Sequence, residues 1–210
     1  MTNPWLTIPA EDYEGHMASP EVGQLQVLNE LFKTVLEEHR PVSVAILGCS
    51  TGNGFEHIDT TTTRRVVGID INPSYLEVAR ARFLGSLPML ELQEQDFTSA
   101  TFAIEPVSLV FAALVFEYVG VREAVRNISR SLSAGGVLVA ALQLASLTCA
   151  PVTKTRFKSL EALAPIMNLV APEEFSLVCL ENSLRQVRQQ RIALKQGKEL
   201  SVGFYKKECS

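Results

Sequence analysis

Long apolar runs are missing from this chain of 210 residues, and no stretch approaches the roughly 20 apolar residues of a membrane-spanning helix. The first residues also lack the basic start and apolar core of a secretory signal peptide. Basic side chains are in the minority, with 19 lysines and arginines against 23 aspartates and glutamates. Because a polyanion would need a basic surface, we expect neither a membrane nor a nucleic-acid partner.

Cysteine is scarce, and the few cysteines are widely separated. Their spacing matches neither the paired ligands of a zinc site nor the disulfide framework of a small secreted protein. We therefore expect no metal site and a reducing, cytoplasmic setting. The residues concerned are Cys49, Cys149, Cys179 and Cys209.

Two phosphate-binding patterns are absent as well. Counting from Gly48, Ser50 and Asn53 stand where a dinucleotide loop would place its second and third glycines, and no Gly-Lys-Ser/Thr follows as in a P-loop. The chain also lacks an evident Tyr-x-x-x-Lys pair, so an NAD-dependent oxidoreductase is disfavoured. The loop that is present has glycines at Gly48, Gly52 and Gly54 and no lysine nearby. Such a loop suits a ligand with a small zwitterionic tail.

An apolar, β-branched run at residues 42–47 leads directly into these glycines. A buried parallel strand needs continuous apolar residues, and glycines after it let the backbone approach a ligand closely. The helix that follows then points its free N–H groups at that ligand. The segment predicts a nucleotide-like cofactor bound at the end of a parallel strand.

Polar acceptors follow two further strands. Asp70 ends the run at residues 65–70 and lies 22 residues after Gly48, close to the roughly 20 expected between a glycine loop and a ribose-binding acid. Its carboxylate can accept hydrogen bonds from both ribose hydroxyls. Gln95 and Asp96 can accept from the exocyclic amine of adenine, and Phe97 can cover a ring face. The combination indicates an adenosine cofactor with an unphosphorylated ribose.

These motifs resemble those of the class I S-adenosylmethionine-dependent methyltransferases, a Rossmann-like family. The resemblance covers residues 40–142, and the downstream pattern extends it to the C-terminus. The matching segments are Gly48-Cys49-Ser50-Thr51-Gly52-Asn53-Gly54, Gly68-Ile69-Asp70, Gln95-Asp96-Phe97 and Ser133-Ala134-Gly135-Gly136-Val137-Leu138.

The resemblance implies an α/β fold, with a doubly wound, mostly parallel seven-stranded sheet that ends in a C-terminal antiparallel hairpin. It also implies S-adenosylmethionine as cofactor and methyl transfer to a small-molecule acceptor by in-line displacement. The chain departs from the family pattern where Ile46 replaces a frequent acid, Ser50 the middle glycine and Ser108 a frequent aspartate. A non-catalytic S-adenosylmethionine-binding protein of the same fold therefore stays open.

We expect one methyltransferase domain over residues 1–210, acting as a monomer or homodimer. Its parts are an N-terminal lid arm and helix at 1–40, a cofactor-binding core at 41–145, and a substrate wall with the terminal hairpin at 146–210. The expected helices are 19–39, 73–83, 121–132 and an interrupted 159–170 split by Pro165. The expected later strands are 107–113, 136–144, 175–184 and 200–205, with Arg185, Arg188 and Arg191 in the loop of the hairpin.

By the resemblance, the cofactor contacts fall on Tyr13, Gly48, Cys49, Ser50, Gly52, Asn53, Asp70, Ile71, Gln95, Asp96, Phe97 and Ala113. Candidates for catalysis are Glu117 and Tyr118 after the fourth strand, for which the alternative is a solvated loop. His16 is a third, with a packed terminal arm as its alternative. Tyr13 or His16 can also hold the methionine carboxylate. The substrate pocket is expected between the N-terminal arm, residues 114–118 and residues 146–170.

Overall fold

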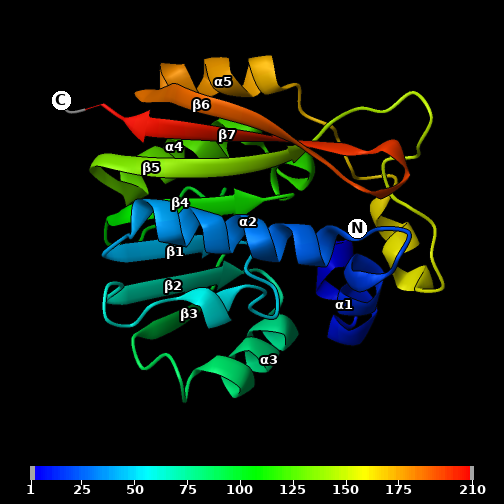
Figure 1. The fold of residues 1–210 in the computed structure, drawn as a ribbon, viewed down its shortest axis with the longest axis horizontal. Helices are drawn as coiled ribbons and strands as arrows, with labels where there is room; N and C mark the ends of the chain where they lie inside the picture. The colour runs from blue at the N-terminus through cyan, green and yellow to red at the C-terminus, as the bar shows by residue number, and fades with distance from the viewer. Residues whose placement is uncertain (1–2, 209–210) are drawn as a thin grey trace.

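A single seven-stranded sheet organises residues 3–208, the part of the chain that the computed structural model describes. The strand order is β3-β2-β1-β4-β5-β7-β6 (Figure 1). β1 to β5 run parallel, and β7 runs antiparallel to both of its neighbours. The strands are β1 Ser43–Leu47, β2 Arg65–Asp70, β3 Leu90–Glu94, β4 Val107–Ala113, β5 Leu132–Gln143, β6 Leu184–Ala193 and β7 Glu199–Lys207. The expected fold class is confirmed.

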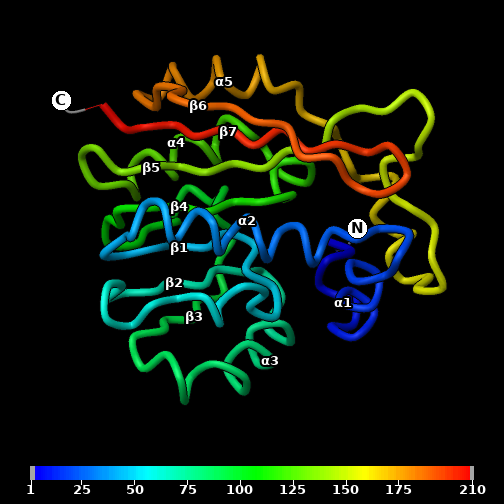
Figure 2. Tube along the Cα trace, viewed as in Figure 1, coloured from blue at the N-terminus to red at the C-terminus, as the bar shows by residue number. Residues whose placement is uncertain are grey.

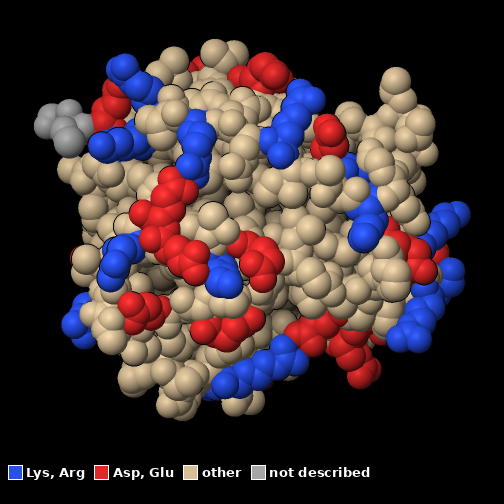
Figure 3. Space-filling model, viewed as in Figure 1, with Lys and Arg blue, Asp and Glu red and all other residues tan. Residues whose placement is uncertain are grey.

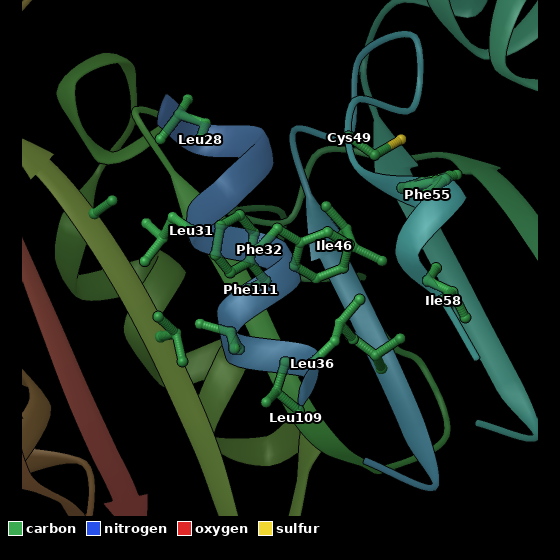
Figure 4. Packing of buried hydrophobic residues seen from close by; sticks show 14 of the residues in the cluster. Leu28, Leu31, Phe32, Leu36, Ile46, Cys49, Phe55, Ile58, Leu109 and Phe111 are labelled. Atoms are coloured by element: carbon green, nitrogen blue, oxygen red, sulfur yellow. The ribbon is translucent and has the colours of Figure 1, made fainter. Parts of the chain in front are cut away.

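Helices cover both faces of this sheet because strand side chains alternate between the faces. In β1, Val44 and Ile46 join the core beneath α2, whereas Ala45 and Leu47 join the core on the side of α4 and α5. In Figure 4, Phe32 of α2 lies against β4, with its ring 4.7 Å from that of Phe111. The helices are α1 Ala10–Ala18, α2 Gln24–His39, α3 Pro73–Phe83, α4 Val121–Ser131 and α5 Pro172–Glu181.

The first long helix begins later than its sequence predicts. Ser19 and Pro20 were expected to start it, but the Ser19 hydroxyl donates to the carbonyl of His16 at 2.8 Å, and the Gly23 amide donates to the carbonyl of Ser19 at 2.9 Å. Gly23 adopts the left-handed conformation with φ 63°. Residues 19–23 therefore form a turn between α1 and α2, and the cap expected at Ser19 ends one helix rather than starting the next.

The prediction of a strand at 175–184 is wrong, because α5 occupies most of that segment. Pro172 takes a position in the first turn, where its missing N–H is harmless, and Phe175, Val178 and Cys179 bury one helical face. The first strand of the hairpin is instead β6. The three arginines expected in the connecting loop, Arg185, Arg188 and Arg191, thus lie in a strand at the edge of the sheet.

Two smaller expectations also change. β5 begins at Leu132 rather than at residue 136, because a register shift between Val107 and Leu109 of β4 lets the glycine segment join the sheet. Residues 159–170 were expected to form an interrupted helix, and only a 3-10 helix at Lys158–Leu163 forms. Among residues 3–208, no helix is both long and apolar enough to cross a membrane.

Candidate active site

A cavity of about 340 Å³ lies at the carboxyl ends of the parallel strands, within the range of roughly 300–1,000 Å³ usual for small-molecule sites. Figures 1 and 2 show α1 and the 3-10 helix Lys158–Leu163 side by side at this end of the sheet. Both elements contribute to the walls. Each strand that ends here adds to the floor, which includes Gly48, Asp70, Gln95, Ala113 and Gln143.

The loop after β1 brings backbone to the cavity. Gly48 has φ 65°, and a Cβ placed there would collide with the Val115 side chain. Ser50 is also left-handed, with φ 50°, and its amide donates to Asp70 Oδ2 at 2.8 Å. The Ser50 hydroxyl is buried close to the Tyr13 phenol and makes no hydrogen bond of standard geometry with the described residues. A polar ligand in the cavity can provide a partner for it.

Asp70 ties two loops together at the end of β2. Its Oδ2 accepts from Ser50, and its Oδ1 accepts from the Asn72 amide at 2.9 Å. Burial raises the pKa of Asp70, while the hydrogen bonds from the Asn72, Ser50 and Ile71 amides oppose that rise. A carboxylate offers about four lone-pair positions, so acceptor capacity remains for a ribose diol.

Three residues expected at the cofactor do not line the cavity. Cys49 is buried in the core, beside Phe55 in Figure 4, and burial raises the pKa of its thiol well above the usual range. A Cβ on Gly52 would lie 2.8 Å from the ring of Phe83, and the Asn53 amide donates to the carbonyl of Leu25 at 3.0 Å. Cys49, Gly52 and Asn53 therefore fix the loop on its side away from the cavity, by contacts with the core and with α2 and α3.

The remaining predicted contacts after β2, β3 and β4 do line the cavity. Asp96 is held by its own turn, because its Oδ1 accepts from the Thr98 amide at 2.8 Å and from the Thr98 hydroxyl at 2.6 Å. Phe97 is buried beside it. Acceptor atoms next to an aromatic wall, the Ser50 hydroxyl and the Asp70 carboxylate together fit an adenosine with a polar tail. The predicted cofactor contacts after β1 that line the cavity here are Asp70, Ile71, Gln95, Asp96, Phe97 and Ala113.

Helix α1 lies across the cavity and places Tyr13 and His16 on its wall. The ring of Tyr13 is 5.4 Å from that of Tyr75, and burial raises the pKa of Tyr13 to about 12. His16 Nδ1 is 3.0 Å from the hydroxyl of Thr155. Burial lowers the pKa of His16, and the charge of Lys198 lowers it further. The imidazole is therefore neutral at neutral pH.

Polar contacts on either side fasten α1 in this position. Glu14 accepts hydrogen bonds from Thr51 in the glycine loop and from Arg82 in α3. On the other side, the Ser159 hydroxyl donates to Asp12 at 2.6 Å. The N-terminal segment is thus joined to both the glycine loop and the segment after β5.

Glu117 and Tyr118 differ in position although they are adjacent. Tyr118 lines the cavity and meets the ring of Trp5 edge-on at 5.0 Å, and burial raises the pKa of its phenol. Glu117 is fully buried and is not among the lining residues, so the solvated loop considered for it is wrong. Its Oε1 accepts from the Gln143 amide at 2.7 Å, its Oε2 has no partner among residues 3–208, and burial raises its pKa to about 7.

Sequence reasoning missed the polar residues at the far end of the cavity. Gln143 ends β5, Gln24 begins α2, and Lys198 precedes β7. Of these, only Gln143 had a signal in the sequence, a polar side chain at the end of a buried apolar strand. Gln24 and Lys198 do not follow apolar strands, and only the tertiary fold brings them to the site.

Comparisons with known proteins agree with this geometry. Residues 46–140 match the family model of the methyltransferase domain. No curated protein sequence matches the chain significantly.

Solved structures share the fold at low sequence identity. N-methyltransferase NodS from Bradyrhizobium japonicum WM9, in complex with S-adenosyl-L-homocysteine, is 16% identical over 98% of this chain and 99% of its own, with a TM-score of 0.70. Magnesium protoporphyrin IX methyltransferase from Synechocystis PCC 6803, with bound S-adenosyl-L-homocysteine, is 12% identical over 94% of each chain, with a TM-score of 0.71. The [4+2]-cyclase SpnF is 13% identical over 88% of this chain and 83% of its own, with a TM-score of 0.70.

Proposed function

We propose that this chain, whose residues 46–140 match the methyltransferase-domain model, is a class I S-adenosylmethionine-dependent methyltransferase that transfers a methyl group to a small-molecule acceptor by in-line displacement. The family-model match, and the fold shared with two methyltransferases that hold S-adenosyl-L-homocysteine, support the expected enzyme class and its cofactor, S-adenosylmethionine. The observation that supports a small acceptor is the partial cover over the cavity, since α1 and the segment after β5 both line it and contact each other. A macromolecular substrate would need an open groove at the same place.

The cofactor would occupy the part of the cavity over β1, β2 and β3. Asp70 would accept from the ribose hydroxyls, Gln95 and Asp96 would accept from the adenine amine, and Phe97 would cover the ring. The loop with Ser50 would meet the amino-acid portion. When bound, S-adenosylmethionine supplies an electrophilic methyl group on a sulfonium sulfur.

The protein's own contribution is alignment and the exclusion of water, since displacement at carbon needs no strong base. Trp5, Tyr118 and Leu160 line the cavity and would shield the acceptor. Where the acceptor must lose a proton, His16 is the group placed to take it, because its imidazole is neutral and its Nδ1 bonds to Thr155. Glu117 would not touch the acceptor, and its role would be to position Gln143 by accepting the hydrogen bond of the Gln143 backbone amide.

The cofactor half is tested by calorimetric titration with S-adenosyl-L-homocysteine, with NAD as the control ligand. We expect micromolar binding of S-adenosyl-L-homocysteine and none of NAD. Replacing Asp70→Ala should weaken binding at least about 10-fold, since two charge-assisted hydrogen bonds are removed. Glu94→Ala is the matched control, because Glu94 pairs with Asp70 in the sheet register but is exposed and outside the cavity.

Absence of S-adenosyl-L-homocysteine binding by the unaltered protein would refute the proposal. Methyl transfer is then assayed with a panel of small amines, phenols and acids. Turnover of one of them supports the small-molecule acceptor, and binding without any turnover would favour a non-catalytic cofactor-binding protein.

A further inference from the structure

Lys198 is a buried cation without an acidic partner. Its side chain lines the cavity, and the residue is only 6% exposed. Nζ donates to the carbonyl of Pro151 at 2.7 Å, and none of the ion pairs among residues 3–208 includes Lys198. An ammonium carries three N–H donors, and burying an unpaired charge is costly. The arrangement is stable if an anion enters the cavity.

Neutral hydrogen-bonding groups surround this ammonium. Gln143 Nε2 donates to the same Pro151 carbonyl at 2.9 Å, so the amide and the ammonium converge on one oxygen. Gln24 Nε2 in turn donates to Gln143 Oε1 at 3.2 Å. His16 also lies on this wall, and the charge of Lys198 lowers its pKa. All four side chains are buried and face one cavity.

No carboxylate of the described residues enters this part of the cavity. The acids on its walls are Asp70, which ends β2, and Asp96, which follows β3, and both strands lie on the far side of β1 and β4. Glu117 lies nearer, but it bonds to the backbone of Gln143 and does not line the cavity. Burial lowers the pKa of Lys198, and the nearby Cys149 thiol opposes that fall only in part.

The remaining walls near this group are apolar. Trp5 and Tyr118 meet edge-on, and the segment after β5 adds buried leucines. A ligand here therefore needs an apolar body with a charged end. The apolar lining residues are Trp5, Tyr118, Val152, Leu160, Leu163 and Met167.

We propose that the methyl acceptor carries a carboxylate, bound by the Lys198 ammonium beside the Gln143 and Gln24 amides, with its apolar body against the aromatic and leucine wall. One ammonium among neutral amides matches a single negative charge. The inference rests on the proposed function, because it places the acceptor opposite the cofactor. The carboxylate of the cofactor's own amino-acid tail is the competing source of the same chemistry.

The probe is octanoate, titrated by calorimetry into the full chain saturated with S-adenosyl-L-homocysteine. We expect octanoate to bind at least about 10-fold more tightly than 1-octanol or octylamine, since only the carboxylate can pair with the ammonium. Lys198→Met should weaken octanoate binding about 10- to 100-fold and leave S-adenosyl-L-homocysteine binding unchanged. Lys198→Arg, which keeps the charge, should retain most of the affinity.

Lys195→Met is the matched control, because Lys195 is exposed in the same turn and should change neither affinity. Equal binding of octanoate and 1-octanol by the unaltered protein would overturn the inference without the use of any variant. Loss of S-adenosyl-L-homocysteine binding in Lys198→Met would also overturn it, by assigning the ammonium to the cofactor. If the unaltered protein binds S-adenosyl-L-homocysteine but not octanoate, only this inference fails; if it binds neither, the proposed function fails first.

Discussion

The two halves of the cavity are built from opposite chemistry. Over β1, β2 and β3 the lining offers acceptors, with Asp70 and Asp96 as its acids. Over β4, β5 and β7 it offers donors, with Lys198 as its cation. The face of the molecule in Figure 3 shows no such division, because acidic and basic side chains are interspersed on it. The charges that line the cavity are thus separated, and such a separation would orient a ligand with hydroxyls at one end and an anion at the other.

The largest expected effect concerns the acid beneath the donor half. Burial raises the pKa of Glu117 to about 7 from an ordinary value of 4.5. Between these two pH values the unfolded chain releases a proton that the folded protein keeps, so the free energy of unfolding falls as pH rises. Glu117→Gln removes this loss of stability. The difference in the free energy of unfolding between the variant and the unaltered protein should therefore shift by about 3 kcal/mol in favour of the variant from pH 4.5 to pH 8.

Urea unfolding at pH 4.5, 6 and 8 measures that difference. Glu94→Gln, which changes an exposed glutamate, serves as the control. Stability curves for Glu117→Gln and the unaltered protein that stay parallel from pH 4.5 to 8 would mean that Glu117 is ionised in the fold. The donor half would then have an anion behind it, and the contrast between the halves would weaken.

A smaller effect is expected from the backbone of the acceptor-rich half. Gly48→Ala places a Cβ against Val115 at a positive φ, so the loop must shift. We expect a loss of about 2 kcal/mol in stability, with S-adenosyl-L-homocysteine binding weakened at least about 10-fold. Gly85→Ala is the matched control, since nothing lies within 4 Å of its added Cβ. Calorimetry and thermal unfolding of both variants check this. Equal stability and equal S-adenosyl-L-homocysteine affinity of the two variants would mean that the glycine loop does not contact the cofactor.

The two halves also differ in how far the sequence predicts them. Asp70 and Gln95 follow apolar strands that alternate with helices, so the position of each at one edge of the sheet can be predicted from local pattern. Lys198 reaches the cavity through the pairing of β6 with β7, and the sequence pattern misplaces β6 because the apolar residues around Phe175 also fit a strand. Their spacing of three and four residues after a proline fits a helix equally well, and only packing decides.

The same limit applies within the glycine loop. Sequence pattern places Gly48 and Gly52 in one motif, yet only Gly48 meets the cavity, because Gly52 turns towards Phe83. Which residue of a loop faces a ligand depends on the left-handed backbone at Ser50, and that conformation is stabilised by the carboxylate of Asp70 from another strand. The spacing of a motif cannot show such a contact.

The smallest expected effect concerns the contact that joins α1 to the acceptor-rich half. Glu14 bonds to Thr51 and Arg82, and the Arg82 hydrogen bond lowers the pKa of Glu14. The ion pair is partly exposed, so Glu14→Gln should cost only about 0.5–1 kcal/mol. Amide hydrogen exchange within α1 should become roughly 2- to 5-fold faster, while exchange in α2 stays unchanged.

Glu11→Gln is the matched control, because Glu11 is an exposed residue of the same helix. If Glu14→Gln left exchange in α1 unchanged, the contacts of α1 with the segment after β5, such as Asp12 with Ser159, would be sufficient to hold it. The helix would then belong to the donor half of the cavity. Faster exchange would instead show that the contact with the glycine loop helps to hold α1 over the cavity.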